Sequence, residues 1–388
     1  MESSPLEVLN QYWGYQSFRS PQAQIIDRVL AGQDALALLP TGGGKSICFQ
    51  VPGLVLGGLT LVVSPLIALM KDQVLRLQDL GIPATYLTSD LTAYQVDKRL
   101  QKALDGAYRF LYLAPERIQS EMFQARLDRL PLSLLAVDEA HCISQWGYDF
   151  RPSYLEIGYI RQERPDIPIL ALTASATTRV QADISQRLRL ADPVTFRKSF
   201  KRENLRYFVL KEENVIARTV DICRRTLGTG IIYVRTRKLT QAVVQQLLNA
   251  GVSAAAYHGG MLNSARDQAQ EAWINNHVRI MVATNAFGMG IDKPDVRFVI
   301  HYNLPFDLES YYQEAGRGGR DGKTALAIAF DNPIDRKEME RWSKDKYPSW
   351  EQLQSHYQQL CNHFRIPNSV PSSQAHLLDI AGLAADFG

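Results

Sequence analysis

One short stretch near the start of the chain restricts the possible folds more than any other feature. Residues 38–46 read Leu-Leu-Pro-Thr-Gly-Gly-Gly-Lys-Ser, after an apolar run that begins at Ala35 and before a segment with a helical pattern. Successive glycines let the backbone curl so that several N–H groups point at one anion, at the positive end of the following helix dipole. This order of strand, glycine turn and helix predicts a phosphate site in an α/β fold.

The candidate nucleotide-binding residues of this stretch are Thr41, Gly42, Gly43, Gly44, Lys45 and Ser46. Lys45 would place a point charge on the β- and γ-phosphates, and the hydroxyl of Ser46 would bind Mg²⁺. The usual phosphate-loop pattern has glycine where this chain has Leu39, so the match is to a variant form. A tight connection without a ligand is the alternative.

The length and composition of the chain set further limits. With 388 residues it can hold two or three domains, and its net charge of +3 permits a nucleic-acid partner without arguing for one. The four cysteines form no C-x-x-C pair, which favours reduced thiols and speaks against a zinc site. We see no signal peptide and no apolar run of about 18 residues. We therefore expect no membrane association, and a cytoplasmic location (bacterial cytosol or nucleoid), or the nucleus in a eukaryote.

Short β-like runs alternate with amphipathic segments, which is typical of parallel sheets wrapped by helices. The first strands are expected at Ala35–Leu39, Leu59–Ser64, Arg109–Leu113, Leu132–Val137 and Ile167–Leu172. The alternation restarts after Phe196, with strands expected at Gly230–Val234, Val252–Tyr257, Arg279–Ala283, Val296–His301 and Ala325–Phe330. We predict two α/β lobes, 1–197 and 198–335, with Arg197–Asn204 as the linker.

Beyond about Asp335 the sequence becomes polar, with helical patterns at Arg336–Lys346 and Trp350–Phe364. A break rich in proline and serine follows, and His376–Gly388 is similar to the opening helix of a helix-turn-helix unit. We therefore expect a small helical extension over 336–388, as the start of a winged-helix-like domain in a natural protein that continues further.

A pair of acidic residues follows one of the predicted strands. The apolar run that ends at Val137 leads into Asp-Glu-Ala-His at 138–141. A carboxylate at the C-terminal edge of a strand suits a second contact to Mg²⁺, which we assign to Asp138. Glu139 would orient or deprotonate an attacking water, and His141 would relay to the other lobe. A solvated helix start is the alternative, but the upstream phosphate loop favours the catalytic interpretation.

The second lobe contains two arginines three positions apart among glycines. Residues 311–321 read Tyr-Tyr-Gln-Glu-Ala-Gly-Arg-Gly-Gly-Arg-Asp. Fixed guanidinium groups suit the charge that develops on a γ-phosphoryl group, so Arg317 and Arg320 are candidate arginine fingers, worth ~10³-fold or more in rate. The alternative is a flexible basic surface loop.

Further motifs occur at Phe18–Gln22, Val63–Gln73, Ala114–Arg117, Tyr257–Gly260 and Ala283–Pro294, and an aromatic loop, Ser144–Pro152, follows the acidic pair. From about Tyr12 to Gly322 the chain resembles the catalytic core of superfamily 2 helicases, and within them the RecQ family of DNA helicases. The resemblance implies two RecA-like lobes, each a mainly parallel sheet flanked by helices, with ATP and Mg²⁺ as cofactors.

The resemblance also assigns roles to individual residues. It implies that Gln22 reads the adenine base through its amide, assisted by Arg19. The implied catalytic residues are Lys45, Asp138, Glu139, Gln313, Arg317 and Arg320. The residues implied in DNA binding or in coupling DNA to ATP hydrolysis are Ser64, His141, Gln145, Trp146, Phe150, Arg151, Thr173 and His258.

The aromatic loop offers ring faces for base stacking, worth ~1–3 kcal/mol per base, and Arg151 for a phosphate. A buried aromatic anchor is the alternative for Trp146. We predict that Trp146→Ala keeps ATP binding but loses most DNA-stimulated hydrolysis. Unchanged stimulation in a folded variant would refute the role.

Two departures from the family pattern matter. Thr-Ala-Ser-Ala at 173–176 has Ser175 where the family commonly has threonine, which keeps a hydroxyl for linking the lobes. Many relatives have a four-cysteine zinc site after the second lobe, but only Cys361 lies in that region here. We therefore predict no zinc, and the segment Asp335–Gly388 as a zinc-free replacement platform.

The resemblance implies an ATP-dependent DNA helicase that travels 3′ to 5′ on single-stranded DNA and unwinds forked DNA as a monomer, in repair or recombination. Protein partners are unknown. Three alternatives stay open: an RNA helicase, a translocase or clamp that hydrolyses ATP without unwinding, and a small-molecule P-loop kinase. The arginine motif and the aromatic loop argue against the kinase.

Overall fold

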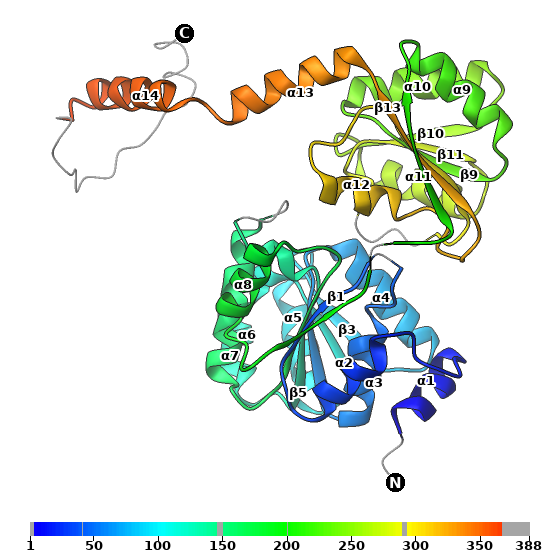
Figure 1. Cartoon of the computed structure of the whole chain (residues 1–388). Helices are drawn as coiled ribbons and strands as arrows, with labels where there is room; N and C mark the ends of the chain where they lie inside the picture. Colours follow the sequence, from blue (N-terminus) through cyan, green and yellow to red (C-terminus); the bar gives the residue numbers. More distant parts are fainter. Residues whose placement is uncertain (1–3, 41, 146–149, 200, 289–292, 367–388) are drawn as a thin grey trace. The chain divides into compact units, whose positions relative to one another are not determined.

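The computed structural model describes residues 4–40, 42–145, 150–199, 201–288 and 293–366. The chain divides into two compact units, Met1–Phe330 and Asp331–Gly388. The first unit contains two separate β-sheets, which belong to the first and second lobes (Figure 1).

The sheet of the first lobe has seven strands in the order β3-β4-β2-β5-β6-β1-β7, and all six neighbouring pairs are parallel. Its strands are β1 Ala35–Leu38, β2 Leu59–Val63, β3 Ala84–Leu87, β4 Phe110–Leu113, β5 Leu132–Val137, β6 Ile169–Thr173 and β7 Val194–Arg197. Its α-helices are α1 Pro5–Trp13, α2 Gln22–Leu30, α3 Ile47–Leu56, α4 Ile67–Asp79, α5 Ala93–Leu104, α6 Glu121–Leu127, α7 Ile157–Glu163 and α8 Thr178–Arg187.

Alternate residues of these strands supply two cores. Leu36 and Leu38 of β1 pack with side chains from α5, α6, α7 and α8 on one face. Ala35 and Ala37 pack with side chains from α2, α3 and α4 on the other face. Because successive strand residues point to opposite faces, an almost continuous apolar run such as β1 fits only a sheet covered on both sides.

The sheet of the second lobe has six strands in the order β10-β11-β9-β12-β13-β8, and the pairings from β10 to β13 are parallel. Its strands are β8 Leu205–Lys211, β9 Thr229–Tyr233, β10 Ala254–Tyr257, β11 Ile280–Ala283, β12 Val296–His301 and β13 Ala325–Asp331, and its helices are α9 Val215–Arg225, α10 Arg237–Asn249, α11 Asn263–Ile274 and α12 Leu308–Ala315. One core packs against α9 and α10, and another surrounds the buried Trp273 of α11. The predicted fold class is confirmed.

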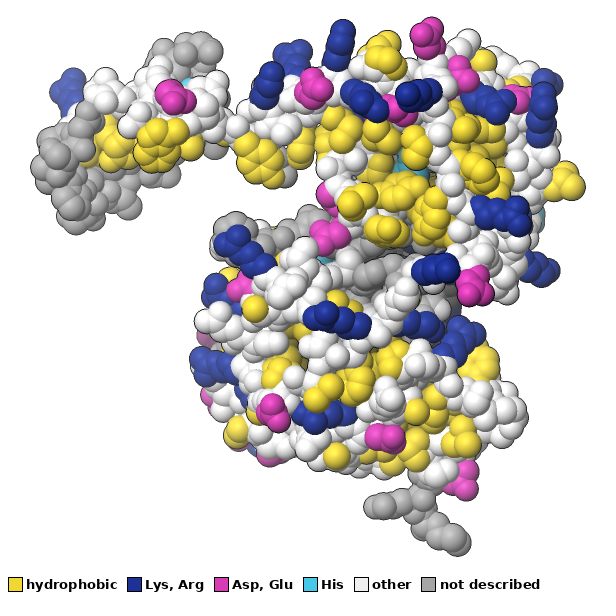
Figure 2. Space-filling view, viewed as in Figure 1, with side chains coloured by type: hydrophobic (Ala, Val, Ile, Leu, Met, Phe, Trp, Pro, Cys, Tyr) yellow, Lys and Arg dark blue, Asp and Glu magenta, His cyan; other side chains and the backbone are white. Residues whose placement is uncertain are grey.

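Three strands that the sequence pattern does not predict, β3, β7 and β8, all lie at sheet edges. Edge strands need no continuous apolar run, because one side of the strand faces no neighbour. In β8, four consecutive residues from Arg206 to Val209 are exposed. Figure 2 shows hydrophobic side chains gathered over the second lobe, and the exposed apolar residues there include Tyr207, Phe208 and Val209.

The predicted linker lies between the two sheets in the chain. Arg197 ends β7, and the described residues of 198–204 form neither helix nor strand before β8 begins at Leu205. The unit boundary falls after Phe330, and the predicted domain limits at Arg197 and Asp335 stay predictions.

The second unit contains both predicted helices, α13 Pro333–Lys346 and α14 Trp350–His363. Ser349 caps α14 in a reciprocal pair of hydrogen bonds with Gln352. The predicted helix at His376–Gly388 lies outside the described residues. Among the helices that the structure describes, none combines the length and the apolar character that a membrane crossing requires.

Candidate nucleotide site

The phosphate loop connects β1 to α3 and takes a backbone shape that requires its glycines. Gly42 and Gly44 have φ angles of 77° and 78°, in the left-handed region that side chains disfavour. A β-carbon at Gly43 would lie 2.7 Å from the carbonyl oxygen of Pro40, which is too close. The three glycines are therefore required by the loop itself. Thr41 lies outside the described residues.

Leu39, which stands where the usual pattern has glycine, is fully buried and belongs to the core beneath α2, α3 and α4. Its N–H donates to the carbonyl of Thr173 at 3.0 Å. The departure from the usual pattern thus lies in the hydrophobic core, before the loop turns.

Lys45 pairs with Glu139 across the first lobe. The Nζ atom of Lys45 lies 3.2 Å from Oε1 of Glu139, and the two side chains are only 17% and 12% exposed. Burial lowers the pKa of Lys45, but the negative charges of Glu139 and Asp138 outweigh it, so the pKa is raised overall. Lys45 is therefore charged, and its ammonium group can bind an anion at the loop.

The two carboxyl groups at the end of β5 have different environments. Burial and the neighbouring charge of Glu139 raise the pKa of Asp138 to about 6, against the opposite influence of Lys45. Burial by itself would raise the pKa of Glu139, but the charges of Lys45 and His141 outweigh this effect, so the pKa of Glu139 is lowered. Glu139 has a φ of 47°, a rare backbone conformation for a residue with a side chain. An ionised carboxylate thus follows β5 directly, on a residue with a rare backbone conformation.

A chain of contacts links Glu139 to the end of β6. The Nδ1 atom of His141 lies 3.4 Å from Oε2 of Glu139 and 2.8 Å from Oγ1 of Thr173. The hydroxyl of Thr173 donates to the carbonyl of Ser175 at 3.0 Å, so it accepts from His141, and the Nδ1 atom of His141 therefore carries a proton. The acidic pair is thereby connected to the segment 173–176.

The second lobe contributes to the same pocket. The pocket, of about 430 Å³, is lined from the first lobe by residues that include Gly42, Gly44, Lys45, Ser46, Asp138 and Glu139, and from the second by Pro294, Gln313, Arg317 and Arg320. A β-carbon at Gly42 would lie 3.5 Å from Cγ of Arg320. The charge of Arg317 contributes to the lowered pKa of Glu139. The described members of the predicted catalytic set therefore lie around one pocket.

Gln22 and Arg19 lie at an adjoining pocket of about 620 Å³, whose lining also includes the aromatic residues Trp13 and Tyr15. The amide nitrogen of Gln22 donates to the carbonyl of Gly44 at 3.0 Å, and the amide oxygen accepts from the backbone N–H of Arg19 at 2.8 Å. An amide has two N–H groups and two lone pairs, so one of each remains for a base.

Four further residues line the 430 Å³ pocket without a role predicted from the sequence: Tyr15, Asp72, Gln73 and Arg76. Gln73 of α4 donates to the hydroxyl of Ser46 at 3.4 Å. Arg76 and Asp72 form an ion pair at 3.1 Å. Acidic and basic residues four apart are typical of a solvated helix face, so their spacing carries no functional signal.

The predicted DNA-contacting and coupling residues are only partly described. Arg151 donates to the carbonyl of Pro65 at 2.8 Å, next to the buried Ser64, so the structure brings these two motifs together. Gln145 is exposed, and Phe150 is partly buried. His258 follows β10 in the second lobe and is half-buried. Trp146 and residues 147–149 lie outside the described residues, as do Met289–Asp292.

Two family models match the chain: the DEAD/DEAH box helicase over residues 19–184 and the helicase conserved C-terminal domain over residues 213–322. The chain is 44% identical over 339 residues to the ATP-dependent DNA helicase RecQ of Pasteurella multocida, a match that covers 86% of this chain and 53% of that protein. It is 41% identical over 337 residues to the probable ATP-dependent DNA helicase RecS of Bacillus subtilis, covering 85% of this chain and 67% of that protein.

Among solved structures, the chain is similar to that of the helicase MrfA bound to DNA, with a TM-score of 0.73, 17% identity, and coverage of 88% of this chain and 50% of that one. At this identity the likeness shows the fold alone, two lobes of the helicase type. The chain spans about half the length of the first RecQ relatives that it matches, which are covered over 53%, 54% and 56% of their length.

Proposed function

Because the chain belongs to the RecQ family of DNA helicases, we propose that it is an ATP-driven motor that acts on DNA. One observation carries the proposal: the phosphate loop, the acidic pair and the two arginines line a single pocket. Relatives such as the RecQ protein of Pasteurella multocida bear the name ATP-dependent DNA helicase. In this proposal the first lobe, 1–197, binds ATP, the second lobe, 198–335, supplies the arginines, and 336–388 forms the helical extension.

In the proposed reaction, the pair between Lys45 and Glu139 breaks when ATP arrives. The β- and γ-phosphates carry more negative charge than one carboxylate, so they compete for the ammonium group of Lys45. Glu139 is then free to orient the attacking water and to accept its proton. Arg317 and Arg320 stabilise the charge that develops on the γ-phosphoryl group, with Gln313 beside them. Gln22 and Arg19 hold the adenine base.

The residues present also fit a Mg²⁺ ion. Ser46 and Asp138 line the pocket together, and both offer the oxygen ligands that Mg²⁺ prefers. Burial and the charge of Glu139 leave Asp138 with a pKa of about 6, so a divalent cation would offset an unfavourable negative charge there. When bound, the ion would neutralise charge on the β- and γ-phosphates.

We further propose that single-stranded DNA binds across both lobes through its phosphates, and that each cycle of hydrolysis moves the protein along the strand in the 3′ to 5′ direction. Such binding is largely independent of sequence and weakens as salt is added. Ser64, Arg151 and His258 are the described candidates for contacts to DNA or for coupling. The same proposal includes forked DNA as the substrate, a role in repair or recombination, a monomeric state, and a location with the DNA in the cytosol, nucleoid or nucleus.

The test is the rate of ATP hydrolysis with single-stranded DNA, forked DNA, duplex DNA and single-stranded RNA, with Lys45→Ala as the inactive control. We expect strong stimulation by single-stranded and forked DNA and little by RNA. Stimulation by RNA alone would favour an RNA helicase, and no stimulation by any nucleic acid would overturn the proposal. Unwinding of a labelled fork, measured beside hydrolysis, separates a helicase from a translocase that does not unwind.

A further inference from the structure

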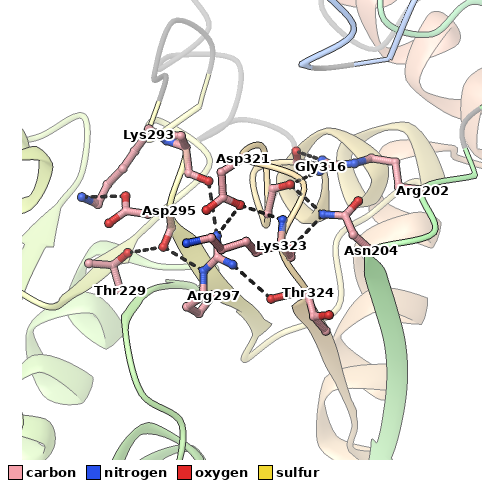
Figure 3. Close-up of polar contacts among 12 residues, drawn as sticks. Arg202, Asn204, Thr229, Lys293, Asp295, Arg297, Gly316, Asp321, Lys323 and Thr324 are labelled. Carbon is pink, nitrogen blue, oxygen red and sulfur yellow. Dashed lines mark hydrogen bonds and ion pairs between the residues drawn. The ribbon is translucent and has the colours of Figure 1, made fainter.

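The segment that carries Arg317 and Arg320, residues 316–324, is held from two sides (Figure 3). On one side the guanidinium of Arg202 donates to the carbonyl of Gly316 at 2.9 Å and to the carbonyl of Gly319. These two carbonyls lie on either side of Arg317 in the chain, and Arg320 follows Gly319 directly. A single planar guanidinium thus bridges the turn that presents both arginines.

Asn204 holds the same turn beside Arg202. Its side-chain nitrogen donates to the carbonyl of Gly319 at 2.7 Å and to the carbonyl of Lys323 at 2.8 Å. Its own carbonyl accepts from the N–H of Ala325 at 2.9 Å, which joins it to the start of β13. We call Arg202 and Asn204 the linker clamp.

The glycines of the turn make this contact possible. A β-carbon at Gly319 would lie 2.6 Å from the side-chain nitrogen of Asn204, and the residue has a φ of 58°. A β-carbon at Gly318 would lie 3.2 Å from the side chain of Leu205. Any larger residue at Gly319 would push the linker clamp away from the turn.

The opposite side of the turn is held by the second sheet itself. Arg297 of β12 forms an ion pair with Asp321 at 2.7 Å and donates to the carbonyl of Thr324 at 3.2 Å (Figure 3). These contacts hold the end of the turn that follows Arg320. The linker clamp bonds the carbonyls of Gly316 and Gly319, which flank Arg317. Strand β12 also holds Gly319, whose N–H donates to the carbonyl of Val296 at 2.8 Å.

The linker clamp also stands at the end of the segment that joins the two sheets. At the start of that segment, the N–H of Lys198 donates to the carbonyl of Leu38, the last residue of β1 before the phosphate loop. Arg202 and Gly316 line a small pocket together with Pro40 and Ser175 of the first lobe. The linker therefore contacts the phosphate-loop strand at one end and the arginine turn at the other.

We propose that Arg202 and Asn204 are positioning residues for the hydrolysis of ATP, which hold Arg317 and Arg320 at the γ-phosphate through the backbone of the turn. This inference rests on the proposed function. The reason is geometric: transition-state charge is stabilised only by donors already in place, and small displacements of such groups cost large factors in rate. Lys45, Ser46 and Gln22, which bind ATP in the proposed function, lie on the first lobe, so the linker clamp should affect the chemical step more than ATP binding.

The experiment compares DNA-stimulated ATP hydrolysis in the whole chain with that of Arg202→Met, Arg202→Lys and Asn204→Ala. The matched control is Arg225→Met, an arginine of α9 that is 79% exposed and pairs with Asp221. We expect kcat to fall about tenfold to a hundredfold in Arg202→Met, with KM for ATP changed by less than about threefold. Arg202→Lys should stay impaired, because an ammonium group cannot bridge two carbonyls in a fixed plane. Arg225→Met should match the unmodified protein.

A double-mutant cycle with Arg320→Ala separates positioning from mere loss of structure. If the linker clamp acts through the arginines, Arg202→Met should change kcat much less in the Arg320→Ala background. A full additive loss there, or an unmodified rate in both Arg202→Met and Asn204→Ala, would overturn the proposal. Should Arg202→Met fail to fold, Asn204→Ala decides in the same cycle. Absence of DNA stimulation in the unmodified protein would instead refute the proposed function.

Discussion

The two halves of the pocket position their charged groups in different ways. In the first lobe, charged side chains hold one another: Lys45 pairs with Glu139, and Glu139 contacts His141. In the second lobe, the turn that carries Arg317 and Arg320 is held mainly through backbone carbonyls, by Arg202, Asn204 and Arg297.

This difference suggests that the two halves of the pocket have different functions in the reaction. A network of charged side chains changes when a new charge arrives, as it would when ATP competes for Lys45. A turn held through its backbone keeps its shape whatever charge its side chains meet, which suits groups that must be in place beforehand. We therefore expect changes in the first half to affect binding and proton transfer, and changes in the second half to affect the rate of the chemical step.

The largest expected effect is that of Arg320→Ala in the second half. We expect kcat for DNA-stimulated hydrolysis to fall ~10³-fold with little change in KM, because the arginine acts on charge that develops during the reaction. Steady-state kinetics over a range of ATP concentrations gives both values. If KM rose sharply and kcat did not change, the assignment of chemistry to the second half would be wrong.

Glu139→Gln should have the next largest effect. The amide cannot accept a proton, so we expect kcat to fall by at least about 10²-fold. It also removes the charge that pairs with Lys45, so ATP binding should stay intact or become tighter, as titration with a fluorescent ATP analogue would measure. Glu121→Gln, an exposed residue at the start of α6, is the matched control. Weaker ATP binding in Glu139→Gln would contradict a competition for Lys45.

Thr173→Val tests the network behind the acidic pair. The substitution removes the hydroxyl that accepts from His141 and leaves a buried N–H without that partner, which should cost roughly 1–3 kcal/mol in the free energy of unfolding. Thr173→Ser keeps the hydroxyl and should restore most of the loss. Denaturant titration measures the effect. Equal stability of the valine and serine variants would show that this contact does not support the first half.

The smallest expected effect is a difference between two buried thiols. Burial raises the pKa of Cys48 in the first lobe and of Cys223 in the second to about 12. At pH 8 only ~10⁻⁴ of each thiol is ionised, so labelling by a thiol reagent requires local opening. Cys48 contacts the carbonyl of Gly44 in the phosphate loop, so ATP should slow its labelling and leave Cys223 unaffected. Mass spectrometry of each cysteine measures both labelling rates. Equal protection of Cys48 and Cys223 by ATP would contradict the expected difference between the two halves.

The raised pKa values of these two thiols also make the free energy of unfolding depend on pH. Their pKa values are higher in the folded protein than in the unfolded chain, so the folded state keeps their protons longer as pH rises. The contribution is present below pH about 9 and is lost between that value and about 12. Replacing both cysteines with alanine should reduce this alkaline loss of stability.

The sequence predicts the residues of the phosphate loop but not the contacts that they make. The glycines, Lys45 and Ser46 are contiguous, and the constraint on their backbone is local, so the pattern alone places them. The pair between Lys45 and Glu139 joins residues far apart in the chain, and only the parallel order of β1 and β5 in the sheet brings them together. No local pattern encodes such a contact.

The linker clamp could not be predicted for a related reason. Arg202 and Asn204 are isolated polar residues in a segment without periodicity, and polar residues in a linker are expected to face water. Their role depends on the glycine turn, whose carbonyls become accessible only when it is folded. The edge strands β7 and β8 were missed because most of their side chains are exposed. The absence of a zinc site stays a prediction.

The most direct test of the central claim is a crystal structure of the protein with ADP, Mg²⁺, aluminium fluoride and single-stranded DNA. We predict that the fluoride group, which mimics the transferred phosphoryl, contacts Lys45 from the first lobe and Arg320 from the second, with Arg202 still bridging Gly316 and Gly319. An occupied phosphate loop with Arg320 turned away from the fluoride group would contradict the claim that the two lobes share one catalytic site.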